Sequence, residues 1–112
     1  HKKWFNRILN DDTTGFMVLE YGQDIIGQLR FDFDEKYPVI SISLNKKYRG
    51  LGLSKYLLNN GINYIKENYN QNTLIADIKK SNARSISFFE AMGFKKEYEI
   101  RNGSALRFIY RG

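Results

Sequence analysis

The spacing of apolar residues along the chain changes several times, and each spacing predicts a different element. Two stretches carry a helical stripe of apolar residues, one from Leu53 to about Tyr69 and one that starts at Ser81 or Asn82 and ends at Gly93. Short segments that are apolar or alternate between apolar and polar residues predict strands. These segments are 16–20, 25–33, 39–44, 73–78, 95–100 and 105–110. Asn102-Gly103 between the last two predicts a hairpin with a primed turn.

The first residues show a different spacing. Trp4, Phe5, Ile8 and Leu9 recur at intervals of one and four, which predicts the end of a short amphipathic helix that the polar segment 11–15 terminates. Together the elements predict an α+β domain, residues 1–112, built around one mostly antiparallel sheet.

Composition supports a single folded domain and excludes several kinds of chemistry. The 112 residues are 42% hydrophobic with one Pro and no Cys, so disulfides, thiolate metal sites and a cysteine nucleophile are excluded. One His cannot build a zinc site, so no metal is expected. No apolar run approaches the roughly 18 residues of a membrane span, and no leader is recognisable, so we expect a cytoplasmic protein without a membrane partner.

The net charge of +6 favours anionic ligands without naming them. The cations come mainly as pairs rather than as a stripe interleaved with aromatic residues, so a nucleic-acid partner is not expected. Most pairs are interpreted as solvated surface. For Lys46-Lys47 beside Arg49, a phosphate-bearing small molecule is the functional alternative.

The segment from Tyr48 to Ser54 is the most informative stretch, because Gly50 and Gly52 stand where a strand gives way to a helix. One interpretation is a tight turn that needs positive φ at a glycine. The other is a pyrophosphate site, because backbone N–H groups converge in such a turn and the first helical turn adds unpaired donors. A P-loop and a dinucleotide fingerprint are excluded, since the required Lys-Ser/Thr and third glycine are absent.

Two motifs in this chain resemble one enzyme family. Arg49-x-x-Gly52-x-Ser54 is similar to the phosphate-binding signature of the GNAT superfamily of acetyl-CoA-dependent N-acetyltransferases. The segments 76–82 and 85–94 are similar to the strand, Asn, helix and Gly-Phe that follow it in the family. The resemblance covers about residues 16–110 and implies a GNAT fold that lacks its first strand and part of its first helix.

The resemblance also implies a co-substrate site for acetyl-CoA, with no metal and no covalent enzyme intermediate. The turn that would bind the pyrophosphate comprises Arg49, Gly50, Leu51, Gly52, Leu53 and Ser54. The backbone of Ile42, Ser43 and Leu44 would pair with the pantetheine arm, and an N–H near Leu44 would stabilise the negative charge that develops on the thioester oxygen. Asn82 would steady the pantetheine or an ordered water, and it is equally a candidate helix N-cap.

Proton transfer is assigned to Asp77, because it stands where ribosomal-protein alanine acetyltransferases have a Glu. The alternative is a surface or supporting carboxylate. Phe89 occupies the position of a Tyr that protonates the thiolate in many relatives, and phenylalanine cannot do this. We therefore interpret Phe89 as core or cofactor packing and identify no general acid.

The acceptor is expected to be a primary amine. The segment 27–32 and the opening His1-x-x-Trp4-Phe5 are similar to the subgroup that acetylates the 4-amino group of nucleotide-linked sugars, with Arg30 and Asp32 as substrate-binding residues. The alternative for these two is a cross-strand ion pair on an exposed face. A protein N-terminal acetyltransferase is the second hypothesis, a non-catalytic acyl-CoA-binding module is a third, and a homodimer stays open.

Overall fold

The computed structural model describes residues 4–10 and 13–112 of the chain, with side chains from residue 13 onward. The described strands are β1 (Trp4–Asn10), β2 (Thr14–Tyr21), β3 (Asp24–Asp32), β4 (Val39–Leu44), β5 (Thr73–Lys79), β6 (Lys95–Ile100) and β7 (Ala105–Arg111). The helices are α1 (Leu53–Tyr69) and α2 (Ala83–Ala91), with 3-10 turns at Lys46–Tyr48 and Arg101–Gly103. The predicted bounds of β4 and α1 agree with the structure.

All described strands form one sheet in the order β1-β2-β3-β4-β5-β7-β6. Every neighbouring pair is antiparallel except β4 and β5, which run parallel with α1 as their crossover. The predicted α+β class with a mostly antiparallel sheet is confirmed.

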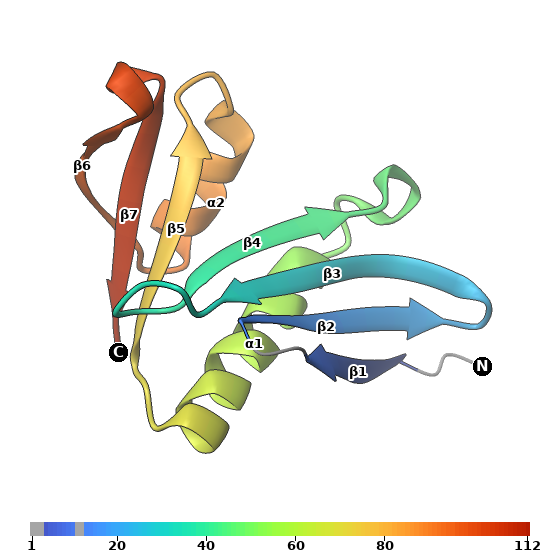
Figure 1. Cartoon of the computed structure of the whole chain (residues 1–112). Helices are drawn as coiled ribbons and strands as arrows, with labels where there is room; N and C mark the ends of the chain where they lie inside the picture. Colours follow the sequence, from blue (N-terminus) through green and yellow to red (C-terminus); the bar gives the residue numbers. More distant parts are fainter. Residues whose placement is uncertain (1–3, 11–12) are drawn as a thin grey trace.

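Both helices cover one face of the sheet (Figure 1). The core lies between them and the strands. Its side chains include Leu19, Leu29, Phe31, Leu57, Leu58, Ile65, Leu74, Phe94 and Phe108, each at most 2% exposed. Helix α1 approaches β3 very closely at Gly61, where an added Cβ would fall 2.0 Å from Leu29 Cδ2. The opposite face carries exposed polar side chains on β3 and β4, including Gln28, Arg30, Ser41 and Ser43.

The helix predicted at the start of the chain is wrong, since residues 4–10 form strand β1 and pair with β2 along their whole length. Trp4-Phe5 and Ile8-Leu9 fit a short helix by spacing, but seven residues make only two turns, which are marginal in isolation. Pairing instead satisfies the backbone groups at the edge of β2. His1 lies outside the described residues, so the structure does not bear on its part in the sugar-acetyltransferase resemblance.

The hairpin between β6 and β7 also differs from the prediction. Positive φ values occur at Arg101, Asn102 and Gly103, as Asn-Gly indicates. The loop nevertheless spans four residues and forms a 3-10 turn, because Ser104 closes it with hydrogen bonds from its backbone N and its Oγ to Arg101 O.

Strands β4 and β5 share only two residue pairs, Val39 with Ile75 and Ile40 with Ala76. Beyond Ile40 the strands diverge, and Figure 1 shows the opening between β4 and the β5–α2 unit. The sheet therefore consists of an N-terminal half, β1–β4, and a C-terminal half, β5–β7, joined at one end and open at the other.

Candidate functional site

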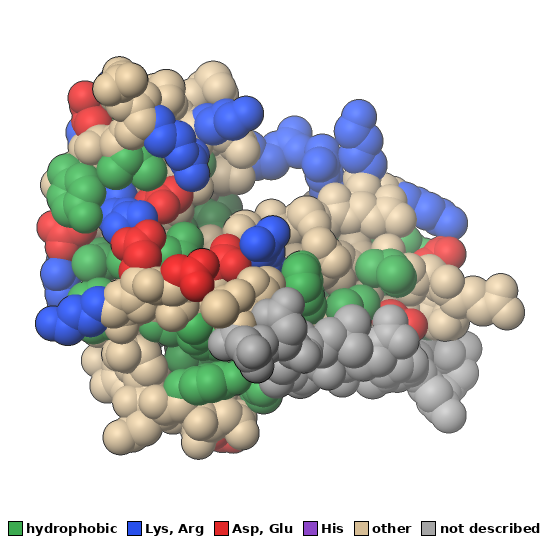
Figure 2. All heavy atoms as spheres, in the orientation of Figure 1, with side chains coloured by type: hydrophobic (Ala, Val, Ile, Leu, Met, Phe, Trp, Pro, Cys, Tyr) green, Lys and Arg blue, Asp and Glu red, His purple; other side chains and the backbone are tan. Residues whose placement is uncertain are grey.

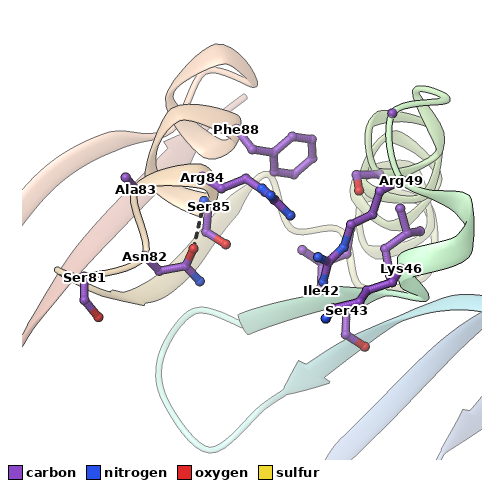
Figure 3. Close-up of a pocket in the computed structure, with 13 residues that line it drawn as sticks. Ile42, Ser43, Lys46, Arg49, Ser81, Asn82, Ala83, Arg84, Ser85 and Phe88 are labelled. Carbon is purple, nitrogen blue, oxygen red and sulfur yellow. Dashed lines mark hydrogen bonds between the residues drawn. The ribbon is translucent and has the colours of Figure 1, made fainter.

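A cavity of roughly 1300 Å³ occupies the open end between the two halves of the sheet. Its walls come from the end of β4, the loop before α1 and the start of α2 (Figure 3). The lining residues are Ile42, Ser43, Leu44, Lys46, Arg49, Gly50, Ser54, Ser81, Asn82, Ala83, Arg84, Ser85 and Phe88. The structure thus brings together most of the residues predicted to bind the co-substrate.

The β4 wall offers backbone groups. Asn45 N donates to Ile26 O at 2.7 Å, and N–H groups alternate sides along a strand. The N–H and C=O groups of Ile42 and Leu44 therefore point away from β3 and toward the opening, where β5 does not pair with them. The backbone of Ser43, by contrast, faces β3.

Gly27 of β3 permits the close approach of this end of β4. It lies opposite Leu44, and an added Cβ would fall 2.7 Å from Ser43 O and 2.8 Å from Leu44 Cδ1. The absence of a side chain at position 27 therefore lets the last residues of β4 lie against β3 rather than nearer to β5.

The loop before α1 contains the predicted glycine turn. Gly50 and Gly52 have φ values of 81° and 74°, so the prediction of positive φ is confirmed at both. Gly52 is the N-cap of α1, and no side chain caps the helix there. The first N–H groups of α1 are thus left to a ligand or to water. Arg49, Gly50 and Ser54 line the cavity, and Leu51, at 66% exposed, lies on the outer surface of the turn.

The same loop is anchored to the β2–β3 turn. Tyr48 Oη donates a hydrogen bond to Asp24 Oδ2, and Lys47 Nζ lies 3.6 Å from the same oxygen. The Tyr48 hydrogen bond and then the Lys47 charge lower the pKa of Asp24, and the Asp24 carboxylate raises the pKa of Tyr48. Asn45 Oδ1 accepts from Lys47 N at 3.1 Å. Lys47 is therefore a structural residue, whereas its neighbour Lys46 lines the cavity.

The lining side chains carry three cations, Lys46, Arg49 and Arg84, and no carboxylate. Arg49 and Arg84 extend from opposite walls into the space between them (Figure 3). Figure 2 shows basic side chains on both rims of the hollow. Arg84 stands in the first turn of α2, where the helix dipole disfavours a cation, so an anion in the cavity would relieve this unfavourable placement.

The α2 wall presents side chains. Asn82 is the N-cap of α2, with Oδ1 accepting from Ser85 N at 3.2 Å, so the predicted capping role is confirmed. Phe88 lines the cavity, whereas Phe89 is only 3% exposed and packs edge-on against Phe94 with ring centroids 5.0 Å apart. Phe89 therefore belongs to the core, which was one of its two predicted interpretations.

Asp77 does not line the cavity. Its carboxylate accepts two hydrogen bonds from Arg107, 2.9 Å from Nε to Oδ1 and 2.8 Å from Nη2 to Oδ2. Arg107 also donates to Glu35, 2.7 Å from Nη1 and 3.0 Å from Nη2. The hydrogen bonds to Asp77 and Glu35 raise the pKa of Arg107, and its guanidinium lowers the pKa of Glu35.

Arg30 and Asp32 lie on the sheet face that the helices leave uncovered. Arg30 Nη2 is 3.1 Å from Asp32 Oδ1, which also accepts from Thr14 Oγ1 at 3.1 Å. With Asp34, Glu35 and Val39 they line a second, smaller cavity of roughly 240 Å³. The ion pair predicted as the alternative for these residues forms on the exposed face, but the prediction of a cross-strand pair is wrong, because both residues lie on β3.

Sequence reasoning named Lys46, together with Lys47, as a candidate phosphate contact, but it did not assign Arg84 and Phe88 to the site. The unfavourable charge of Arg84 at a helix N-terminus was a readable signal. Phe88 and Phe89 are adjacent aromatic residues, so sequence alone does not tell which one faces the cavity. Among the described residues, no helix is long and apolar enough to cross a membrane.

A family model for the acetyltransferase (GNAT) family matches residues 1–94. An N-alpha-acetyltransferase of Sulfurisphaera tokodaii is 25% identical over 112 residues, with 88% of this chain and 67% of that protein covered. An N-alpha-acetyltransferase of Saccharolobus solfataricus is 28% identical over 95 residues, covering 83% of this chain. The chain spans only 56% of that second relative's length.

Two solved structures show the same fold. A mutant of the spermidine N-acetyltransferase SpeG from Vibrio cholerae superposes with a TM-score of 0.80 at 18% identity, covering 90% of this chain and 66% of that chain. The N-acetyltransferase PseH from Campylobacter jejuni superposes with a TM-score of 0.76 at 22% identity, covering 90% and 70%. The family model, the splayed sheet and the glycine turn agree, and the chain belongs to the GNAT family of acetyltransferases, enzymes that use acetyl-CoA.

Proposed function

We propose that this chain transfers the acetyl group of acetyl-CoA to a primary amine. The observation that carries the proposal is the continuity of the cavity. It runs from the unpaired edge of β4, past the Gly50–Gly52 turn, to the uncapped start of α1.

The residues present fit coenzyme A. Its pyrophosphate and ribose phosphate need cations and N–H donors, which Lys46, Arg49, Arg84 and the start of α1 provide. Its pantetheine arm carries amides that pair with a strand edge, which Ile42 and Leu44 provide. Asn82 and Phe88 line the opposite wall of the cavity.

Leu44 N–H is the proposed donor to the thioester oxygen. It is the last such group along β4 that points into the opening, and it needs no side chain. One donor of this kind contributes about 2.7–4 kcal/mol to catalysis in enzymes that stabilise an oxyanion.

Asp77 remains the proposed base for the acceptor, because an alkylammonium has a pKa of about 10 and must lose its proton before it attacks. Asp77 lies on β5 next to the opening, on the helix-free face. Replacing Asp77 with Asn should lower kcat most at neutral pH and less at high pH, where the amine loses its proton unaided. An equal loss of kcat at every pH would contradict a role in proton removal.

For the acceptor we propose the 4-amino group of a nucleotide-linked sugar. The support is the sequence of β3 from Gly27 to Asp32, and the exposed strip that Gln28, Arg30 and Ser41 form beside the opening. To bind an acceptor phosphate, Arg30 would give up its hydrogen bonds to Asp32 and donate to the phosphate instead.

A peptide N-terminus is the second candidate, and two observations favour it. Both curated relatives described above are N-alpha-acetyltransferases. In addition, Asp32, Asp34 and Glu35 outnumber Arg30 around the smaller cavity, which suits a cationic amine better than a phosphate.

The test is release of free thiol from acetyl-CoA in the presence of single acceptors. The panel contains 4-amino nucleotide sugars, N-terminal peptides and spermidine, with acetyl-CoA binding measured separately by calorimetry. Turnover with one class of amine assigns the acceptor. Tight binding of acetyl-CoA without turnover of any amine would instead support a non-catalytic acyl-CoA-binding module, and absence of binding would contradict the site.

A further inference from the structure

The two halves of the sheet are joined over a short distance. Besides the two β4–β5 residue pairs, Ile75 N donates to Pro38 O at 2.9 Å at the same end. The β3–β4 loop, residues 33–38, extends beyond β4 and crosses β5 to reach β7 (Figure 1). The angle between β4 and β5 is therefore set where this loop meets the C-terminal half.

Arg107 lies at that junction, with its side chain 14% exposed. Four of its donor contacts are used, two to Asp77 of β5 and two to Glu35 of the β3–β4 loop. Both pairs have the parallel geometry in which a guanidinium binds a carboxylate most strongly. One side chain of β7 thus binds a carboxylate from each half.

Among the side chains that the structure describes, the other ion pairs of the C-terminal half lie within that half. Arg111 Nη2 is 2.6 Å from Glu97 Oε1, and Lys80 pairs with Glu99. These pairs are more exposed, and such pairs contribute little to stability. Arg107 differs in its burial and in the two halves that it joins. Figure 2 shows acidic and basic side chains gathered over the β3–β4 loop and the strands beside it.

We propose that Arg107 is a positioning residue for acetyl transfer: by binding Glu35 and Asp77 together, it fixes the angle at which β4 and β5 diverge. Arg107 does not line the cavity, so it acts through the strands. The open ends of β4 and β5 carry the two walls of the site, so a small rotation at the junction changes the distance from Leu44 to Asn82 and Arg84. Misplacement of reacting groups by about 1 Å can reduce a rate by about a hundredfold.

A spectroscopic experiment tests the angle without any substrate. The chain has no Cys, so cysteines placed at the exposed positions Gln28 and Lys79, Q28C and K79C, accept spin labels only there. Pulsed dipolar spectroscopy should show one narrow distance distribution. Glu35→Leu, at a side chain 47% exposed, should broaden or shift it, and so should Arg107→Lys, which keeps the charge but loses the fork. Arg111→Gln on the same strand is the matched control and should leave it unchanged.

The kinetic part rests on the proposed function and uses the chain without labels. Glu35→Leu should lower kcat for acetyl transfer by about threefold to tenfold, with a smaller change in the KM for acetyl-CoA. Glu35→Gln, which keeps one acceptor for Arg107, should recover most of this loss. Arg111→Gln should leave both constants unchanged.

The outcomes separate the two proposals. Distance distributions that stay the same in Glu35→Leu and Arg107→Lys would overturn the positioning role, whatever the chain acetylates. A changed distribution with no acetyl transfer in the unmodified chain would support the structural role of Arg107 and contradict the proposed function. A changed distribution with unchanged kinetics would overturn the link between the angle and catalysis.

Discussion

The two walls of the cavity use different chemistry. The N-terminal wall, from Ile42 to Ser54, presents mainly backbone groups: the unpaired edge of β4, a turn with two left-handed glycines and the start of α1. The C-terminal wall presents side chains, above all those of Asn82, Arg84 and Phe88.

This difference determines which substitutions each wall tolerates. A backbone wall is insensitive to most side-chain changes and is disrupted only by residues that alter φ or remove an N–H. A side-chain wall loses a contact with each truncation. The substitutions below therefore differ in kind between the walls, and they are ordered by the size of their expected effect.

Leu44→Pro should have the largest effect, because it deletes the N–H proposed to meet the thioester oxygen. That N–H faces the opening and not β3, so the β3–β4 hydrogen bonds are retained. We expect kcat to fall by about a hundredfold to a thousandfold in steady-state assays. Binding of coenzyme A, measured by calorimetry, should change little. A loss confined to KM would contradict the assignment of Leu44.

Gly52→Val should raise the KM for acetyl-CoA by about tenfold or more, because a β-branched residue at φ 74° strains the turn that presents the helical N–H groups. Gly22→Val is the matched control, since Gly22 has φ 62° and, like Gly52, has no atom within 4 Å of an added Cβ. Both variants should lose similar stability on thermal unfolding. Equal KM values in the two would show that strain alone, and not the site, explains the result.

Arg84→Gln tests the side-chain wall and should raise the KM for acetyl-CoA by about threefold to tenfold, as expected for one lost charge-assisted contact. The dependence of KM on salt should become weaker in the same variant. Lys95→Gln, an exposed cation of β6 outside the cavity, controls for net charge. An identical response in both variants would assign the effect to the overall field of the protein.

Tyr48→Phe should have the smallest effect, because it removes only a contact that anchors the loop before α1 to the β2–β3 turn. The hydrogen bond from Tyr48 is the main cause of the low pKa of Asp24, so its removal should raise that pKa toward the usual 3.8. A carboxylate with a lowered pKa stabilises the fold above its unfolded-state value and loses that contribution as the pH falls through its folded-state value. As the pH falls, the stabilising contribution of the Asp24 carboxylate should therefore be lost at a higher pH in the variant than in the native chain. Carboxyl NMR titration of Asp24 checks this, and an unmoved midpoint would contradict it.

The backbone wall was predictable from the sequence, whereas Asn82 was the only one of the three main side chains of the other wall that could be predicted. Strand β4 and helix α1 have clean periods of two and of 3.6, and the glycines between them signal a turn with positive φ. Asn82 was predictable because Asn before a helical stripe is a preferred N-cap. Arg84 and Phe88 enter the cavity only because the parallel pairing of β4 and β5 places α2 beside α1's first turn, and no local pattern encodes that pairing.

Two further features depend on contacts between distant segments. Residues 4–10 have a spacing compatible with a helix, but they form a strand because they pair with the open edge of β2. Arg107 and Glu35 are 72 positions apart, and neither stands in a recognisable motif. Pairings of this kind depend on the folded topology, which one sequence does not reveal.

Gly27 has a consequence for enzyme engineering. Because a methyl group there would collide with Ser43 O and Leu44 Cδ1, a side chain at position 27 would displace the end of β4, although Gly27 itself does not line the cavity. Side chains of increasing volume at this position would displace the end of β4 by increasing amounts. A library that varies position 27 would therefore change the shape of the cavity while every residue that lines it stays native.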